Sequence, residues 1–201
     1  MSDAPYWNQR FAGAEYVFGT APNAFLTRQK PHLPQHGRAL AVGDGEGRNG
    51  VWLAQQGLDV HSIDLSPVAQ AKARLLSQSA GVNLTFELAD LANWNWPTEA
   101  YEVIVAIFIQ FCGPIERAKI FAGIRQSLVP GALLLIEGYT PKQLAYGTGG
   151  SKTIENLYTR ELLEREFSEF TSMEIAEYDA HLAEGTAHEG MSAVIDLVAR
   201  K

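Results

Sequence analysis

The chain has 201 residues, of which 46% are hydrophobic and 19% charged, and its formal net charge at pH 7 is −7. This length and composition are typical of a single globular domain with a continuous core. Phosphate contacts need clustered Lys and Arg, whereas no basic run here is longer than two residues, so we expect no nucleic-acid partner.

The N-terminal start lacks the basic and apolar stretches of a signal peptide, so we expect a cytoplasmic protein. The single cysteine, Cys112, excludes an intramolecular disulfide. No apolar run is long enough to span a bilayer, so no membrane association is predicted.

Residues 1–35 form a predicted N-terminal arm, and residues 36–201 the predicted core of the same single domain. The arm contains more aromatic residues than a disordered tail carries, including Trp7, Phe11 and Phe18. We therefore expect an ordered arm, which either acts as a lid or covers the sheet.

A strand, a glycine-rich turn, a helix near residues 48–56 and a second strand are predicted over residues 38–64. The turn contains Gly43, Gly45 and Gly47. Glycines permit positive φ and close approach of a ligand, and the helix that follows presents free N–H groups. Asp64 follows Gly47 by 17 positions and ends the second strand, where a carboxylate accepts hydrogen bonds from ribose hydroxyls. The ligand should therefore contain ribose.

Two glycine registers fit this turn. Residues 45–50 match GxGxxG, the dinucleotide pattern, which is weak evidence alone. Residues 43–47 match GxGxG, and residues 39–49 resemble the first motif of class I S-adenosylmethionine (SAM) methyltransferases. The resemblance departs at Ala41, where most members carry an acidic residue that helps hold the methionine amino group.

The segment after Asp64 favours the methyltransferase register. Ser66 and Pro67 are typical of a helix start, and the predicted helix continues to Ala80 before Gly81. A short strand within residues 83–90 then ends in a second carboxylate, Asp90. Either aspartate taken alone is often a simple cap or turn residue.

The resemblance implies SAM as cofactor and S-adenosylhomocysteine (SAH) as product, with Asp90 bonding the adenine amino group beside the Leu91 N–H. The implied cofactor-binding residues are Gly43, Asp44, Gly45, Glu46, Gly47, Arg48, Asn49, Asp64, Leu65, Asp90, Leu91 and Ile107, with Arg10 and Tyr16 of the arm. Arg48 and Asn49 are equally consistent with solvated residues of a first helical turn.

The remaining chain continues the alternation. Strands are predicted over residues 101–108 and 132–138, separated by a helix from Pro114 that stops at residues 129–131. A helix over residues 159–167 precedes strands over 172–179 and 191–199, whose connection of about a dozen residues allows antiparallel pairing. Residues 128–137 also resemble the late motif of the family. We therefore predict an α/β fold: a doubly wound, Rossmann-like, mostly parallel sheet with an antiparallel C-terminal strand, in three α/β/α layers.

A narrower resemblance covers nearly the whole chain. Residues 7–11, 16–26 and 45–49 look like the tellurite-resistance branch of class I methyltransferases, which overlaps with thiopurine-type enzymes. The resemblance implies a small-molecule substrate, often a soft tellurium, selenium or sulfur acceptor. We expect a monomer or a homodimer.

Ligands of open parallel sheets bind beyond the carboxyl ends of the strands, so residues 107–113, residues 138–152 and the arm should wall the acceptor site. Methyl transfer is an in-line displacement that depends mainly on geometry and loss of water. His188 is the candidate base for an acceptor that must lose a proton, and Tyr146 is a weaker one. The other histidines show no metal-ligand spacing, so no metal is predicted.

Two alternatives remain at this point. The absence of a clear base, together with Ala41, is consistent with a SAM-binding regulatory protein without catalysis. The register of residues 45–50 is consistent with an NAD-binding Rossmann protein. NAD, and not SAM, would then stabilise the protein against thermal unfolding.

Overall fold

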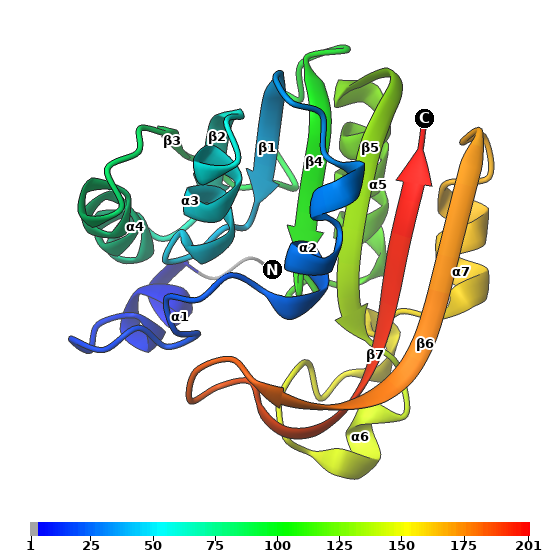
Figure 1. Cartoon of the computed structure of the whole chain (residues 1–201). Helices are drawn as coiled ribbons and strands as arrows, with labels where there is room; N and C mark the ends of the chain where they lie inside the picture. Colours follow the sequence, from blue (N-terminus) through cyan, green and yellow to red (C-terminus); the bar gives the residue numbers. More distant parts are fainter. Residues whose placement is uncertain (1–3) are drawn as a thin grey trace.

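The computed structural model describes residues 4–201, and residues 1–3 of the predicted arm lie outside this part. Within it, the strands form one seven-stranded sheet in the order β3-β2-β1-β4-β5-β7-β6 (Figure 1). Neighbours among the first five strands pair in parallel, and β7 pairs antiparallel with both β5 and β6. The strands are β1 (Arg38–Val42), β2 (Asp59–Asp64), β3 (Thr85–Leu88), β4 (Tyr101–Ile107), β5 (Leu128–Tyr139), β6 (Ser172–Ala183) and β7 (Glu189–Arg200).

Helices cover both faces of this sheet, which confirms the predicted fold class. They are α1 (Ala4–Arg10), α2 (Ala24–Arg28), α3 (Arg48–Gln55), α4 (Pro67–Ser79), α5 (Pro114–Ser127), α6 (Gln143–Tyr146) and α7 (Arg160–Glu166), with the 3-10 turns η1 (Lys30–His32) and η2 (Ile154–Asn156). The Ser66 hydroxyl accepts a hydrogen bond from the Ala69 N–H at 3.1 Å, as its predicted role as the N-cap of α4 requires. None of these helices combines the length and apolarity needed to cross a membrane.

The core has two sides because strand residues alternate between the faces of the sheet. On one side, Phe121 of α5 and Leu163 of α7 pack against strand residues such as Ile104. On the other side, Leu26 of α2 and Leu53 of α3 pack against the neighbouring strand positions. The sheet is therefore the middle of three layers.

Two predicted boundaries were wrong. The predicted stop at residues 129–131 lies inside β5, where the pairing with β4 jumps from Leu128 to Leu133 around Gly131, whose φ is +78°. The connection between the last two strands spans residues 184–188 rather than a dozen residues. Strands β6 and β7 pair as far as Ala183 and Glu189, because backbone hydrogen bonds extend the hairpin beyond its hydrophobic pattern.

The arm crosses below the carboxyl ends of β1 and β4 before α2 packs on the front face of the sheet (Figure 1). This path brings the arm to the edge where open parallel sheets bind ligands.

Candidate active site

A pocket of about 440 Å³ lies at the carboxyl ends of the parallel strands, where the chain order reverses between β1 and β4. Its walls come from the glycine turn, the ends of β2, β3, β4 and β5, the arm, and the β6–β7 turn. Thus segments far apart in the sequence meet at the predicted edge of the sheet.

The three glycines of the turn differ in what they do. Gly43, Gly45 and Gly47 all have positive φ, at +60°, +58° and +87°. Gly43 and Gly45 line the pocket, where the missing side chain allows a ligand to approach the backbone. Gly47 does not line the pocket. It packs against α4, where an added Cβ would lie 2.6 Å from the Cβ of Ala73.

Two acidic residues of the same turn make internal contacts. The Asp44 carboxylate accepts hydrogen bonds from the Gly50 N–H at 3.0 Å and the Ser62 hydroxyl at 2.7 Å. Glu46 accepts one from the Val17 N–H at 2.8 Å and pairs with Lys72 at 2.8 Å. Glu46 lies outside the pocket lining and fastens the arm to α4, so its geometry, like that of Gly47, is structural rather than ligand-facing.

Asp64 faces the pocket from the end of β2. Its carboxylate accepts hydrogen bonds from the Gly45 N–H at 2.9 Å and the Ser66 N–H at 2.8 Å. Burial raises the pKa of this carboxyl to about 6, and its two backbone hydrogen bonds only partly offset the effect. The glycine turn and the ribose-binding candidate are thus joined by one hydrogen bond.

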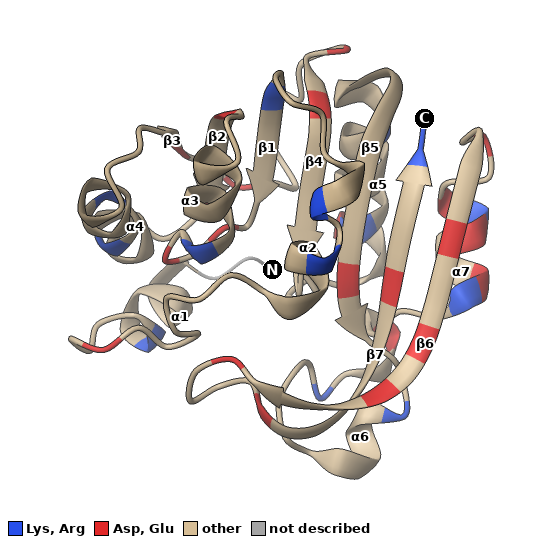
Figure 2. Cartoon of the chain, in the orientation of Figure 1, with Lys and Arg blue, Asp and Glu red and all other residues tan. Residues whose placement is uncertain are grey.

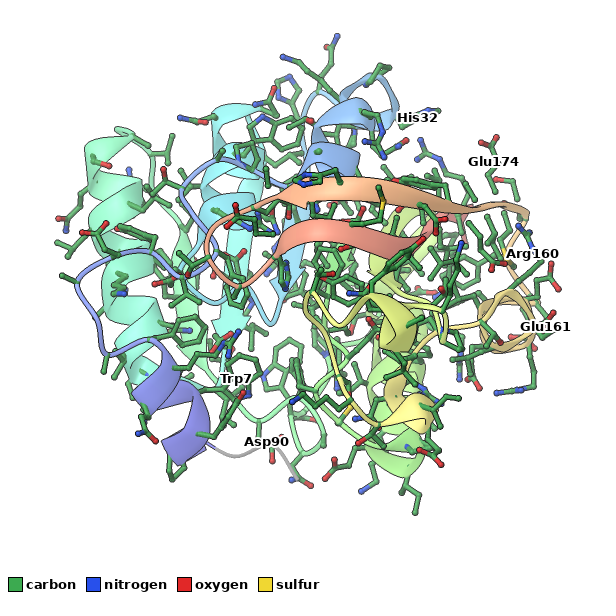
Figure 3. All side chains as sticks on the ribbon, turned by 90° about the horizontal axis from the view of Figure 1, so that it is seen from below. Trp7, His32, Asp90, Arg160, Glu161 and Glu174 are labelled. Carbon is green, nitrogen blue, oxygen red and sulfur yellow. The ribbon has the colours of Figure 1, made fainter. Side chains whose placement is uncertain are left out.

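The second predicted carboxylate reaches the same pocket. Asp90 lines it together with Leu91, Leu65 and Ile107, all of which the sequence had predicted. Asp90 accepts hydrogen bonds from the Ala92 N–H at 3.1 Å and the Asn93 side chain at 2.8 Å. Figure 3, seen from below, shows Asp90 on the same side of the molecule as Trp7 of the arm.

Aromatic arm residues form a wall of the pocket. Trp7 and Phe11 stack with ring centroids 5.7 Å apart, and Phe18 follows along the same wall. The Arg10 guanidinium also lines the pocket, 5.6 Å from the Phe18 ring centroid. Tyr16 does not: its hydroxyl donates to the Lys72 carbonyl at 3.1 Å, outside the lining.

Arg48 and Asn49 begin α3 and both line the pocket. Arg48 is only 7% exposed in its side chain and donates from one terminal nitrogen to Glu184 at 2.7 Å. Its other terminal nitrogen is buried without a hydrogen-bond partner. Asn49 accepts a hydrogen bond from the Asn23 N–H at 2.9 Å through its side-chain oxygen. Neither residue is the solvated helix start that the sequence also allowed.

His188 lines the pocket from the turn between β6 and β7. Its ring centroid lies 4.6 Å from that of Phe18 and 4.4 Å from that of Phe108, and its Nδ1 is buried without a partner. Burial, followed by the cations Arg48 and Arg10, lowers the pKa of His188 to about 3. The imidazole is therefore neutral near pH 7.

Tyr146 has no place in this site. Its hydroxyl donates to Asp179 at 3.0 Å, and the residue is absent from the pocket lining. The structure thus places this candidate base beside Asp179 of β6, away from the residues that line the pocket.

Several lining residues escaped individual prediction although their segments were predicted as walls. Phe108 has φ of +54°, a strained value for a bulky residue that no sequence pattern indicates. Gln110 holds the end of β5 by donating to the Tyr139 carbonyl at 2.8 Å and accepting from the Tyr139 N–H at 2.6 Å. The Tyr139 hydroxyl is buried and without a hydrogen-bond partner.

Ala41 is buried within β1 and does not line the pocket. The contact that an acidic residue makes at this position in the resembled family is thus missing here. In residues 4–201, no three His, Cys, Asp or Glu side chains are arranged to hold a metal ion.

Residues 39–131, which contain the glycine turn, Asp64 and Asp90, match the family model described as a methyltransferase domain. No curated protein matches the chain. The NAD alternative is set aside by this family match and by the sheet, in which antiparallel β7 takes the place beside β5 that a dinucleotide fold gives to a parallel strand.

Solved structures share the fold at low identity. A structure reported for the conversion of a disulfide bond into a thioacetal group during echinomycin biosynthesis is 18% identical, with a TM-score of 0.74 over 98% of this chain and 89% of that one. TehB from Haemophilus influenzae is 16% identical, with a TM-score of 0.69 over 98% of this chain and 66% of that one.

A third similar structure was solved with the cofactor. Phosphoethanolamine N-methyltransferase 2 of Haemonchus contortus, in complex with SAM, is 18% identical, with a TM-score of 0.68 over 98% of this chain and 56% of that one. Residues 39–131 thus match a methyltransferase domain, and the chain shares the fold of a methyltransferase that was solved with SAM.

Proposed function

We propose that this enzyme transfers the methyl group of SAM to a small-molecule acceptor whose reacting atom is a soft, electron-rich sulfur, selenium or tellurium. The observation that carries the proposal is the aromatic and cationic lining of the pocket around His188. At 16% identity the likeness to TehB shows the fold alone, so the acceptor class is argued from this chain's residues.

The acidic lining residues all follow parallel strands. Among the described residues that line the pocket, the carboxylates are Asp44, Asp64 and Asp90, and they follow β1, β2 and β3. These carboxylates suit an adenosine, whose hydroxyl and amino groups donate hydrogen bonds to carboxylates.

The lining around His188 is aromatic and cationic. The ring centroids of Phe18 and Phe108 lie 4.6 and 4.4 Å from that of His188. Burial, followed by the nearby cations Arg48 and Arg10, lowers the pKa of this histidine. A cationic amine would meet like charge there without a carboxylate to receive it, whereas a thiolate or a chalcogen oxyanion would be attracted. Polarisable aromatic walls also favour soft atoms.

The residues present fit the predicted cofactor. We propose that Asp64 binds the ribose hydroxyls, that Asp90 and the Leu91 N–H bind the adenine edge, and that Leu65 and Ile107 pack on the adenine ring. The unpartnered nitrogen of Arg48 is available for the methionine carboxylate, beside the backbone of Gly43 and Gly45.

The chemistry then needs positioning more than proton transfer. SAM, when bound, supplies a methyl group on a sulfonium, whose sulfur keeps the electron pair of the broken bond and leaves as the thioether of SAH. The arm and the rings around His188 exclude water and hold the acceptor in line with that bond. A neutral His188 accepts a hydrogen bond from an acceptor that still carries its proton.

The organisation is proposed as one domain, with the arm of residues 1–35 completing the acceptor wall over the core of residues 36–201. We also retain the prediction of a monomer or homodimer.

The first test is calorimetric titration with SAM, SAH and NAD. We expect SAM and SAH to bind, NAD to be silent, and Asp64→Ala to weaken SAH binding at least tenfold, since two hydrogen bonds to a carboxylate are lost. Asp59→Ala is the matched control, because Asp59 is an exposed carboxylate at the other end of β2. NAD binding without SAM binding would contradict the proposal.

The acceptor class is tested with the same protein and labelled SAM. Tellurite, selenite and small thiols form one panel, and small primary and secondary amines form the other. We expect methylated product from the first panel. Turnover confined to amines would overturn the acceptor proposal and leave the cofactor site intact.

A further inference from the structure

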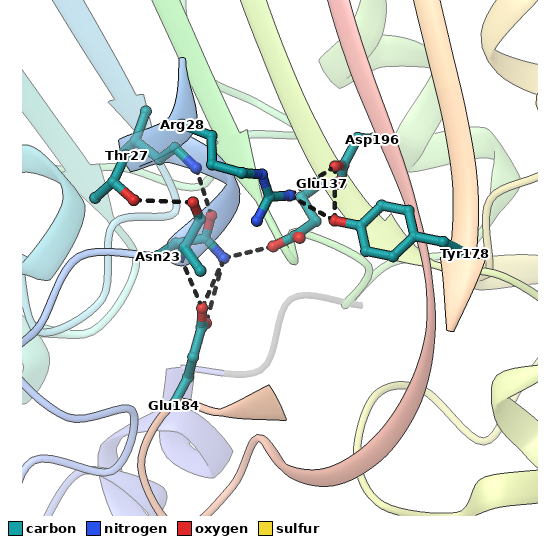
Figure 4. Close-up of polar contacts among 9 residues, drawn as sticks. Asn23, Thr27, Arg28, Glu137, Tyr178, Glu184 and Asp196 are labelled. Carbon is teal, nitrogen blue, oxygen red and sulfur yellow. Dashed lines mark hydrogen bonds and ion pairs between the residues drawn. The ribbon is translucent and has the colours of Figure 1, made fainter. Parts of the chain in front are cut away.

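Glu184 occupies the five-residue turn that joins β6 to β7, outside the pocket lining. Its side chain is 9% exposed and accepts hydrogen bonds from Arg48 at 2.7 Å, the Ala24 N–H at 3.0 Å and the Asn23 side chain at 3.1 Å. We call Asn23, Ala24, Arg48 and Glu184 the Glu184 junction. Figure 4 shows the contacts of Glu184 with Asn23. It also shows that Asn23 contacts the carboxylate of Glu137.

The junction joins three segments that are distant in the sequence. Asn23 and Ala24 connect the arm to α2, Arg48 begins α3 beside the cofactor end, and Glu184 belongs to the turn that carries His188. The Glu184 carboxylate thus accepts hydrogen bonds from the arm and from the start of α3, while Glu184 itself belongs to the β6–β7 turn.

The turn itself is tightly held. The Glu184 N–H donates to the His188 carbonyl at 2.9 Å, which closes the turn directly at the histidine. Gly185 has φ of +74° and packs so closely on the arm that a Cβ would clash with the carbonyl oxygen of Val17. The direction of the His188 ring therefore depends on how this turn is seated.

Neighbouring charges allow the junction to stay buried. Glu137 and Asp196 face each other in the β5–β7 pairing, and Asn23 donates to both Glu137 and Glu184. Figure 2 shows acidic residues on the adjacent strands β5, β7 and β6. Burial, followed by the neighbouring carboxylates, raises the pKa of Glu137 well above its usual range, and burial also raises the pKa of Asp196. Arg48 lies 2.7 Å from Glu184, and Arg28 lies 3.2 Å from Asp196.

We propose that Glu184 is a positioning residue that couples the two ends of the active site: it holds the Arg48 guanidinium so that its free nitrogen faces the cofactor end, and it seats the turn that presents His188 to the acceptor. This inference rests on the proposed function, because Arg48 must bind the cofactor for the coupling to matter. Glu184 itself touches neither cofactor nor acceptor.

The test measures SAH affinity by calorimetry in Glu184→Gln and Glu184→Asp. Loss of the charge-assisted contact frees Arg48 to rotate, so we expect the Kd of SAH to rise about tenfold in Glu184→Gln. Glu184→Asp keeps the charge and should recover part of the affinity. Glu189→Gln is the matched control, since Glu189 is an exposed glutamate of the same hairpin, and its Kd should equal that of the wild type.

A double-mutant cycle shows whether the effect passes through Arg48. In an Arg48→Met background, Glu184→Gln should change the Kd of SAH by less than about twofold, because the coupled partner is already absent. Amide exchange in the ligand-free protein supplies a second measurement: the Ala24 and Glu184 N–H groups should exchange faster in Glu184→Gln and not in Glu189→Gln.

The outcomes separate the two claims. Equal SAH affinity in the wild type and Glu184→Gln, or a full tenfold effect of Glu184→Gln in the Arg48→Met background, would overturn the coupling while SAH binding still supported the proposed function. A wild-type protein that does not bind SAH would instead remove the proposed function. Unchanged amide exchange at Ala24 and Glu184 would overturn the seating of the turn whatever the cofactor does.

Discussion

Asp64 titrates close to the pH at which the enzyme is expected to work, because burial raises its pKa to about 6. Above this pH the carboxylate is ionised and both oxygens accept hydrogen bonds. Below it, the bound proton removes one acceptor while the Gly45 and Ser66 N–H groups still occupy the others. Ligand that binds the ionised form also lowers the pKa in the complex.

We therefore predict that SAH binding weakens as the pH falls through about 6, with the Kd rising several-fold between pH 7 and pH 5. Calorimetry across this range is the measurement. Asp64→Asn cannot ionise, so its weaker binding should be nearly independent of pH. If the Kd of SAH changed equally with pH in both proteins, the titrating group would not be Asp64.

Unlike Asp64, His188 does not titrate in this pH range, since a pKa of about 3 keeps its ring neutral. With an acceptor that must lose a proton, we predict that His188→Ala lowers kcat at least tenfold and changes the Kd of SAH by less than about threefold. Steady-state kinetics and calorimetry on the same variant separate the two. Unchanged turnover would remove His188 from the reaction.

At the scale of elements, the glycine turn and α3 owe their position to α4 as well as to the sheet. Gly47 allows α3 to begin against Ala73, and Asp44 ties the turn to β2 through Ser62. These contacts thus fix the conformation of the glycine turn without a bound ligand.

We predict that Gly47→Ala lowers the free energy of unfolding by about 2–4 kcal/mol, from the positive φ and the overlap with Ala73 together. Gly81→Ala is the control, because Gly81 also has positive φ, at +68°, but nothing within 4 Å of an added Cβ. It should cost only about 1 kcal/mol. Urea unfolding measures both, and equal losses would show that the contact with Ala73 is unimportant.

At the scale of the whole molecule, the placement of β7 between β5 and β6 determines the wall of the pocket that carries His188. Because β7 returns antiparallel, the turn at residues 184–188 comes back over the carboxyl ends of the strands and meets the arm. The pocket therefore closes with contacts between residues more than a hundred positions apart, such as Arg48 with Glu184.

Local chemistry made much of this protein predictable from its sequence. The alternation of apolar strands and helices, the cap at Ser66, the glycine turn and the carboxylates after β2 and β3 each depend on neighbouring residues. The register of parallel strands then brings Asp64 and Asp90 to one edge. The fold class and the presence of both aspartates in one pocket follow from these features.

Only the tertiary structure decided which polar groups of that pattern face the pocket. Glu46, Tyr16 and Tyr146 lie in segments whose chemistry suited the site, yet they bond Val17, Lys72 and Asp179 instead. The strained Phe108 and the junction of Arg48 with Glu184 have no local signature, because both depend on contacts between distant segments. Sequence alone thus determined the order of strands and helices and the two carboxylates at one edge of the sheet, because these depend on neighbouring residues, whereas contacts between distant segments determined the part of the pocket around His188.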